Sequence, residues 1–303
     1  MITAEGLTKR YGDKTAVDDV SFQVQPGQVT GFLGPNGAGK STTMRMIVGL
    51  DRPTAGQVTI GGAAYASLRA PLTQVGVLLD AKAVHTGRTA RNHLRAMAAT
   101  HGIPASRVDE VMDLTGISSV ARKRAGKFSL GMGQRLGIAS ALLGDPQTLI
   151  LDEPVNGLDP EGVRWVRQFV RHYAAQGRTV LLSSHLMSEM AQTADHVIVL
   201  GRGRVLADAP LDELVRAWTS TTVVVSSPRL ADLANAIAAP DVTVTTLSPD
   251  RARITGVAPA VIGDRAAQHG IAVHELTPET GSLEEAYLAV TGDAVEYSSQ
   301  EIR

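Results

Sequence analysis

The segment GPNGAGKST occupies residues 34–42 and fits the pattern G-x-x-x-x-G-K-[ST]. The apolar run at 28–33 predicts a buried strand before it, and a helix is predicted from 41 to about 49. Glycines in such a loop let backbone N–H groups converge on phosphate oxygens, and the helix N-terminus adds partial positive charge. The segment therefore predicts a nucleotide-phosphate site formed by Gly34, Pro35, Asn36, Gly37, Ala38, Gly39, Lys40, Ser41 and Thr42.

Two side chains of this loop and two later carboxylates have expected chemical roles. Lys40 brings a positive charge to the β- and γ-phosphates, and Ser41 offers its hydroxyl to Mg²⁺. The segment LILDEP at 149–154 ends an apolar strand in Asp152 and Glu153, at the sheet edge where α/β proteins place their ligands. Asp152 is predicted to hold Mg²⁺ through a water. Glu153 is predicted to take a proton from the water that attacks the γ-phosphate, which typically contributes about 10²–10⁴-fold to the rate.

The composition indicates a globular protein that is not dedicated to nucleic acid. Of the 303 residues 44% are hydrophobic and 19% charged, the net charge is −1, and only 4% are aromatic. Duplex binding normally needs a concentrated positive face, and single-strand binding needs aromatic platforms, so no nucleic-acid partner is predicted. The sequence has no cysteine, which excludes disulfides and zinc–thiolate sites and suits a reducing compartment. We expect a cytoplasmic protein, because no apolar run approaches the ~20 residues of a membrane span and the N-terminus lacks signal-peptide features.

Alternating strand and helix patterns up to about residue 217 predict a largely parallel α/β sheet. Further strands are expected at 74–79, 148–151, 179–182 and 196–200. Helices are expected at 89–100, 104–115, 129–143, 160–176 and 186–193.

After residue 217 the pattern changes to β-α-β-β-α-β, which predicts a small split-βαβ domain over 218–303. Its expected strands are 221–226, 242–247, 252–256 and 271–277, and its expected helices are 228–238 and 259–268. A last helix is expected after Ser282, since Ser282 and Glu285 form a capping box.

The chain resembles the ATP-binding subunits of ABC transporters. Five segments in the family's order carry the resemblance: the loop at 34–42, Asp152–Glu153, the stretch NGLD at 156–159, Ser184–His185, and FSLGMGQRLG at 128–137. The resemblance implies a P-loop NTPase cassette over 1–217, with a mixed sheet core and a helical subdomain at about 81–145, followed by a small α+β accessory domain. It also implies a second ATP-binding subunit, with a homodimer expected, and an integral-membrane permease on a separate chain. The protein would then lie peripherally on the inner face of the cell membrane.

The segment at 128–137 corresponds to the family's L-S-G-G-Q motif, which binds the γ-phosphate of an ATP held by the partner's phosphate loop. Ser129 and Gly131, the expected donors to that anion, are present. Leu130 stands where the first glycine is usual, and Met132 where glutamine is usual. Weaker binding to the partner's nucleotide is expected, and a heterodimer with an intact partner is the alternative arrangement.

The resemblance assigns four further site residues. Tyr11 is expected against the adenine ring, Asp159 beside the nucleotide, and His185 at the γ-phosphate, where it orients the water. Asp80 stands where the family has a glutamine that senses Mg²⁺. Because a carboxylate close to the γ-phosphate is repelled, Asp80 is predicted either to be a metal ligand or to lie farther from the nucleotide.

The region after residue 220 resembles the C-terminal part of drug-resistance exporter subunits, and Leu283-Glu284-Glu285-Ala286-Tyr287 resembles their closing motif. The resemblance implies an ATPase that powers export of drugs, antibiotics or other small hydrophobic compounds. The alternative is a soluble ABC-type ATPase that acts on ribosomes or DNA. Ribosome-acting members usually carry two cassettes in one chain, and repair members carry a long coiled coil, and neither is seen in this sequence.

Overall fold

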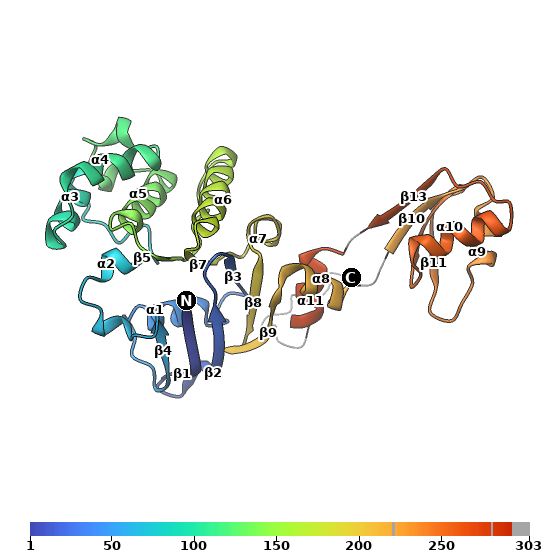
Figure 1. Cartoon of the computed structure of the whole chain (residues 1–303), viewed down its shortest axis with the longest axis horizontal. Coiled ribbons are helices and arrows are strands. Elements are labelled where there is room, and N and C mark those ends of the chain that lie inside the picture. Colours follow the sequence, from blue (N-terminus) through green and yellow to red (C-terminus); the bar gives the residue numbers. More distant parts are fainter. Residues whose placement is uncertain (220–221, 280, 293–303) are drawn as a thin grey trace. The chain divides into compact units, whose positions relative to one another are not determined.

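The computed structural model describes residues 1–219, 222–279 and 281–292, and it divides into two compact units. One unit contains Met1–Leu211 and the other Asp212–Val290. Figure 1 colours the first from blue to yellow and most of the second in orange and red. The predicted accessory domain includes residues 220–221, 280 and 293–303, which lie outside the described part of the chain.

A six-stranded sheet forms the centre of the first unit, with strand order β5-β6-β7-β3-β8-β9. Its first five strands are parallel, and β9 is antiparallel to β8. Every residue of β3, β6 and β7 is buried, which explains their uninterrupted apolar sequences. The strands are β3 (Val29–Leu33), β5 (Val75–Leu78), β6 (Thr148–Leu151), β7 (Thr179–Ser183), β8 (His196–Gly201) and β9 (Arg204–Pro210).

A three-stranded antiparallel sheet of order β2-β1-β4 was not predicted from the sequence. It consists of β1 (Ile2–Tyr11), β2 (Lys14–Val24) and β4 (Ala55–Ile60). The apolar alternation along β1 is broken by register shifts between Ala4 and Leu7 and between Leu7 and Lys9. Phe22 of β2 meets Phe32 of β3 edge to face, with ring centroids 5.1 Å apart, so the two sheets share one apolar core.

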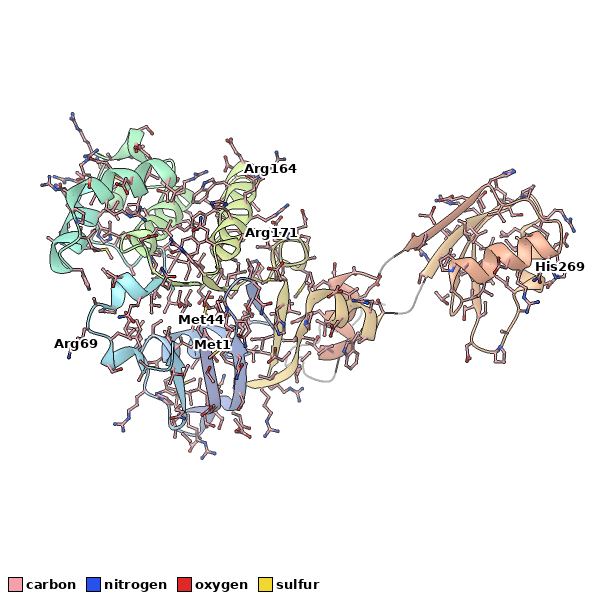
Figure 2. All side chains as sticks on the ribbon, in the orientation of Figure 1. Met1, Met44, Arg69, Arg164, Arg171 and His269 are labelled. Carbon is pink, nitrogen blue, oxygen red and sulfur yellow. The ribbon has the colours of Figure 1, made fainter. Side chains whose placement is uncertain are left out.

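Helices surround this core, and those predicted from the sequence are present. They are α1 (Lys40–Ile47), α3 (Ala90–Thr100), α4 (Ala105–Leu114), α5 (Leu130–Leu142), α6 (Pro160–Ala175) and α7 (Met187–Thr193). The short helix α2 (Pro71–Gln74) was not predicted. Helices α3, α4 and α5 pack on one another and are drawn in green in Figure 1. Figure 2 shows side chains filling the interior, among them Met44 of α1, which is fully buried. None of the helices in the described ranges is long and apolar enough to span a membrane.

The second unit contains a four-stranded antiparallel sheet of order β11-β12-β10-β13, the arrangement expected for a split-βαβ domain. The strands are β10 (Thr222–Ser226), β11 (Thr243–Ser248), β12 (Arg251–Thr255) and β13 (Glu275–Glu279), and the helices are α8 (Leu211–Trp218), α9 (Leu230–Ala236), α10 (Pro259–Gln268) and α11 (Leu283–Thr291). A separate apolar core lies between the sheet and helices α9 and α10.

The starts of β13 and α11 can be compared with the sequence predictions. Strand β13 begins at Glu275 rather than at 271, because the N–H of Ile271 donates to Ala266 and closes the end of α10. The predicted capping box is present at the start of α11. The N–H of Glu285 donates to Ser282 Oγ at 3.1 Å, and the N–H of Ser282 donates to Glu285 Oε2 at 3.2 Å.

Candidate functional site

The glycine-rich loop between β3 and α1 is held tightly by neighbouring backbone. A Cβ on Gly34 would lie 2.4 Å from the carbonyl oxygen of Leu200, and one on Gly39 would lie 2.7 Å from that of Ala16. Gly39 also has a φ of 102°, in the region that favours glycine. The loop can follow this path only with glycine at these two positions.

Lys40 bends back over the loop that precedes it. Its ammonium donates to the carbonyl oxygens of Gly34 at 2.6 Å and Pro35 at 3.2 Å, and only 7% of the residue is exposed. Burial lowers the pKa of Lys40, and the carboxylates of Glu153 and Asp152 act in the opposite direction. A bound polyphosphate would also favour the charged form, so the site suits an anion.

Asp152 and Glu153 follow β6 at its carboxyl end, and Ser183 of the adjacent strand β7 connects them. The Ser183 hydroxyl donates to Asp152 Oδ1 at 2.5 Å and accepts the N–H of Glu153 at 2.9 Å. Glu153 has a φ of 49°, which is uncommon for a residue with a side chain. Ser183 is fully buried and was not identified from the sequence, where its only signal is a polar residue ending an apolar strand.

The loop and the carboxylates face a single cleft of about 410 Å³. It is lined by Tyr11, Lys14, Ala16, Asn36, Gly37, Ala38, Gly39, Lys40, Ser41, Thr42, Leu79, Asp152 and Glu153. The structure thus brings together the predicted phosphate loop, both predicted acids and Tyr11. Lys14, Ala16 and Leu79 were not predicted.

His185 lies beside the cleft and contacts Glu153. Its Nδ1 is 2.7 Å from Glu153 Oε2, and about half of its side chain is exposed. His185 does not line the cleft, but the loop after β7 brings it to the carboxylate of its predicted catalytic partner.

Tyr11 is held at the mouth of the cleft from two directions. Its hydroxyl donates to Asp51 Oδ2 at 3.0 Å, and Arg45 Nε is 2.7 Å from the same oxygen. The Lys9 ammonium lies 4.9 Å from the ring centroid. The ring is therefore positioned without a ligand, and the residue is 48% exposed.

Ser129, Gly131 and Asp159 do not line the cleft of their own chain. Ser129 caps α5, and its Oγ accepts the N–H of Met132 at 3.3 Å. A Cβ on Gly131 would lie 2.9 Å from the carbonyl oxygen of Gly157. Asp159 caps α6, and its Oδ1 accepts the N–H of Gly162 at 2.9 Å.

Asp80 is also absent from the cleft lining, although its neighbour Leu79 contributes to it. The Asp80 side chain is exposed, and its Oδ1 accepts the N–H of Lys82 at 2.7 Å. Of the two predicted possibilities for Asp80, this position fits a residue that lies farther from the nucleotide.

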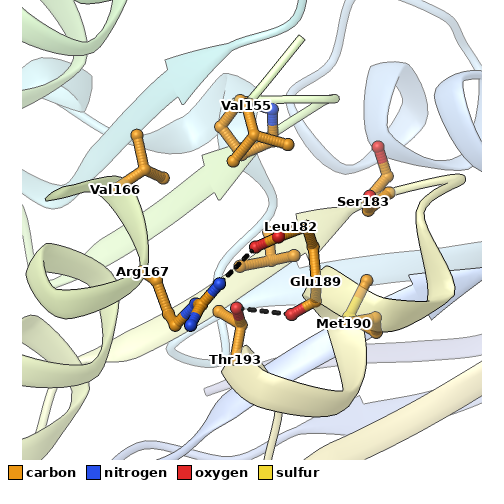
Figure 3. Close-up of a pocket in the computed structure, with 10 residues that line it drawn as sticks. Val155, Val166, Arg167, Leu182, Ser183, Glu189, Met190 and Thr193 are labelled. Carbon is orange, nitrogen blue, oxygen red and sulfur yellow. Dashed lines mark hydrogen bonds and ion pairs between the residues drawn. The ribbon is translucent and has the colours of Figure 1, made fainter. Parts of the chain in front are cut away.

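A small apolar pocket is lined in part by an ion pair between α6 and α7 (Figure 3). Arg167 Nη2 is 2.7 Å from Glu189 Oε2, and Thr193 Oγ1 donates to the Glu189 carbonyl oxygen at 2.7 Å. The ion pair joins the helix after residues 156–159 to the helix after His185.

Together, a parallel sheet, a phosphate loop and paired acids at the strand ends define an ATPase of the P-loop class. The ABC transporter family matches residues 17–156, and a domain of unknown function, DUF8746, matches residues 221–284. The chain is 33% identical over 304 residues to the uncharacterized ABC transporter ATP-binding protein YhcH of Bacillus subtilis, and the match covers 98% of this chain and 97% of that protein. The chain therefore belongs to the ABC transporter family of ATP-binding proteins, and the predictions of family, fold class and ATPase activity are confirmed.

Two relatives have names that state a role. The chain is 42% identical over 217 residues to the bacitracin transport ATP-binding protein BcrA of Bacillus licheniformis, with 71% of each chain covered. It is 35% identical over 303 residues to the daunorubicin resistance ATP-binding protein DrrA3 of Streptomyces coeruleorubidus, with 96% of each covered.

Solved structures agree on the fold. An ATP-binding subunit of an ABC transporter superposes with a TM-score of 0.63 at 28% identity, over 72% of this chain and 92% of that one. A bacterial ABC transporter cassette solved as a dimer superposes with a TM-score of 0.64 at 24% identity, over 69% of this chain and 98% of that one.

Proposed function

We propose that the chain is the ATP-hydrolysing subunit of an exporter of antibiotics or other small hydrophobic compounds. The observation that carries the proposal is the cleft in which Lys40 and the phosphate loop face Asp152 and Glu153. Relatives named for bacitracin transport and daunorubicin resistance support the substrate class. The rival function, a soluble ATPase acting on ribosomes or DNA, has no comparable support. A gene for a membrane protein next to this one would be further support for transport.

The side chains of the cleft suggest how ATP is held and hydrolysed. Backbone N–H groups of 36–42 and the Lys40 ammonium bind the phosphates, and Tyr11 packs against the adenine. Glu153 takes a proton from the attacking water, and His185, 2.7 Å from the Glu153 carboxylate, orients that water. Because Ser183 Oγ accepts the Glu153 N–H, the backbone that carries this carboxylate is held before the nucleotide binds.

The donors in the cleft also fit Mg²⁺. Ser41 and Asp152 both line it, and they supply the hydroxyl and carboxylate oxygens that this ion prefers. No group of three or more His, Cys, Asp and Glu residues suited to a metal occurs in the described ranges. That agrees with an ion bound by one or two side chains together with phosphate oxygens and water. When bound, Mg²⁺ would neutralise charge that develops on the phosphates.

Ser129, Gly131 and Asp159 are proposed to serve the nucleotide of a second ATP-binding subunit. None of them lines the cleft of its own chain, while Ser129 and Gly131 lie at the exposed start of α5. In a homodimer, each of two ATP molecules would lie between the phosphate loop of one chain and the start of α5 of the other. The dimer would act at the cytoplasmic face of the membrane, attached to a permease on a separate chain.

We further propose that residues 1–217 are the ATP-binding cassette, with 81–145 as its helical subdomain, and that 218–303 are an accessory domain that supports the dimer. The accessory region contains no constellation of catalytic side chains in its described part, which motivates a structural role. Loss of dimerisation on deletion after Ala217 would support this role, and unchanged dimerisation with unchanged ATPase activity would exclude it.

The proposed function is tested with Glu153→Gln, which removes the base and keeps the size of the side chain. We expect the ATP hydrolysis rate to fall by about 10²–10⁴-fold, the usual contribution of a general base. We also expect the molar mass, measured by light scattering, to double when Mg-ATP is added. ATP would hold two chains together, and without hydrolysis the dimer would not separate.

The matched control is the double variant Glu153→Gln with Ser129→Arg, which places a bulky cation at the start of α5 and leaves the cleft intact. It should bind Mg-ATP but remain a monomer. Wild-type hydrolysis in Glu153→Gln would remove Glu153 from the mechanism. A Glu153→Gln chain that stays monomeric would favour a heterodimer.

A further inference from the structure

Glu153 has a backbone conformation that its own residue type does not favour. With a φ of 49° it lies in the left-handed region, where a Cβ crowds the backbone. Such conformations persist only when surrounding groups hold them. The question is which groups hold Glu153.

Hydrogen bonds from two distant parts of the chain hold the two sides of this residue. Its N–H donates to Ser183 Oγ of β7 at 2.9 Å. Its carbonyl oxygen accepts the side-chain amide of Gln134, Nε2, at 2.7 Å, and a local N–H from Asn156 at 3.1 Å. Gln134 lies on α5, 19 residues earlier in the chain, and only 4% of it is exposed.

Helix α5 contacts the same segment at a second point, one turn earlier. A Cβ on Gly157 would lie 2.2 Å from Cδ2 of Leu130, so the Leu130 side chain fills the space beside this glycine. A Cβ on Gly131 would in turn lie 2.9 Å from the carbonyl oxygen of Gly157. The first turn of α5 and the segment 153–157 therefore pack together at both ends, through Leu130 and Gln134.

We propose that Gln134 is a positioning residue that holds Glu153 in its reactive conformation and links it to the start of α5. The inference rests on the proposed function, in which Glu153 is the base and Ser129 contacts the partner's nucleotide. A displacement of the first turn of α5 then reaches the carbonyl of Glu153 through one buried hydrogen bond. Each chain can in this way adjust its own base to the nucleotide held by the other.

The test is Gln134→Met, which fills a similar volume but cannot donate to the carbonyl. The control is Ser140→Ala on the same helix, since the Ser140 hydroxyl donates within α5, to the carbonyl oxygen of Leu136. Three quantities are compared with the wild type: kcat for ATP, the Kd of a fluorescent ATP analogue, and hydrogen–deuterium exchange of peptides covering 152–158.

For Gln134→Met we expect kcat to fall about ten- to a hundredfold, the size of effect that a small misplacement of a catalytic group produces. The nucleotide Kd should stay unchanged, because Gln134 does not line the cleft, and exchange across 152–158 should become faster. Ser140→Ala should change none of the three. Gln134→Leu, which has a similar volume and also lacks a donor, replaces the methionine variant if that one does not fold.

An unchanged kcat, or a Kd that weakens as much as kcat falls, would overturn the proposal. Glu153→Gln measured in parallel separates this failure from failure of the proposed function. If Glu153→Gln is inactive while Gln134→Met is fully active, only the positioning role of Gln134 is lost. If Glu153→Gln retains activity, the role of Glu153 itself is wrong.

Discussion

At the scale of single residues, several side chains of the site form hydrogen bonds with backbone groups of the site itself. Lys40 bonds to two carbonyl oxygens of its own loop, and Ser183 and Gln134 bond to the N–H and C=O of Glu153. These bonds fix the reactive groups before a nucleotide is present. Preorganisation of this kind reduces the reorganisation that the reaction itself would otherwise require.

Asp80 gives a prediction at this scale. Its carboxylate is exposed, accepts the N–H of Lys82 and does not line the cleft, so we expect that its charge is not needed for hydrolysis. Asp80→Gln should therefore keep kcat within about threefold of the wild type, as for most exposed positions, or raise it. Steady-state ATPase assays at saturating Mg-ATP test this.

Asp80→Asn is the matched control, since it keeps the side-chain length and the acceptor oxygen for Lys82 and removes only the charge. The two variants should behave alike. A hundredfold loss of kcat in both would instead make Asp80 a metal ligand.

A site residue could be predicted from the sequence when the residues it acts with are its neighbours in the sequence. The phosphate loop and the pair Asp152–Glu153 are contiguous in the sequence, and their chemistry follows from residue type and spacing. Gln134 and Ser183 act on Glu153, whose backbone lies 19 and 30 positions away, through contacts that only the folded sheet and helix create. No local pattern in the sequence distinguishes them from other buried polar residues.

At the scale of elements, the helix starts beside the site depend on side-chain caps. Ser129 caps α5 and Asp159 caps α6, so two of the three residues proposed for the partner's nucleotide also stabilise their own helix. Asp159 Oδ1 accepts the N–H of Gly162 at 2.9 Å. The same carboxylate therefore has a local role that can be measured separately from any role in the dimer.

We predict that Asp159→Ala lowers the free energy of unfolding by about 1 kcal/mol, the usual cost of removing an N-cap side chain. Asp159→Asn should leave it nearly unchanged, because asparagine caps as well as aspartate. Thermal and urea unfolding of the two variants and the wild type measure the difference. Equal losses in both variants would show that the negative charge, not the cap, stabilises this end of α6.

The elements themselves were predictable where one pattern dominates. Strands β3, β6 and β7 are buried along their whole length and are continuous apolar runs, and α6 has a cap and a proline at its first turn. Strands β1, β2 and β4 were missed: register shifts interrupt the pairing of β1 with both neighbours, and only Ile60 of β4 is buried. These strands are stabilised by pairing with strands that are distant in the sequence, and their own residue patterns do not reveal this pairing.

At the scale of the whole molecule, the two units have separate apolar cores. The core that contains Ile198 lies in the first unit, and the core that contains Ile254 lies in the second, with no residue common to both. Because each core is complete in itself, each unit has the means to fold cooperatively alone. The site residues of the cleft all belong to the first unit.

This separation predicts two thermal transitions that respond independently to mutation. Ile254→Ala, at a fully buried position, should destabilise the second unit by about 2–5 kcal/mol and lower only its transition temperature. Ile198→Ala, the same change at an equally buried position of the first unit, should lower the other transition. Calorimetry of both variants, with ATPase assays at 25 °C, separates the effects. Hydrolysis should persist in Ile254→Ala, whereas a single transition lowered by either change would mean that the two units unfold as one.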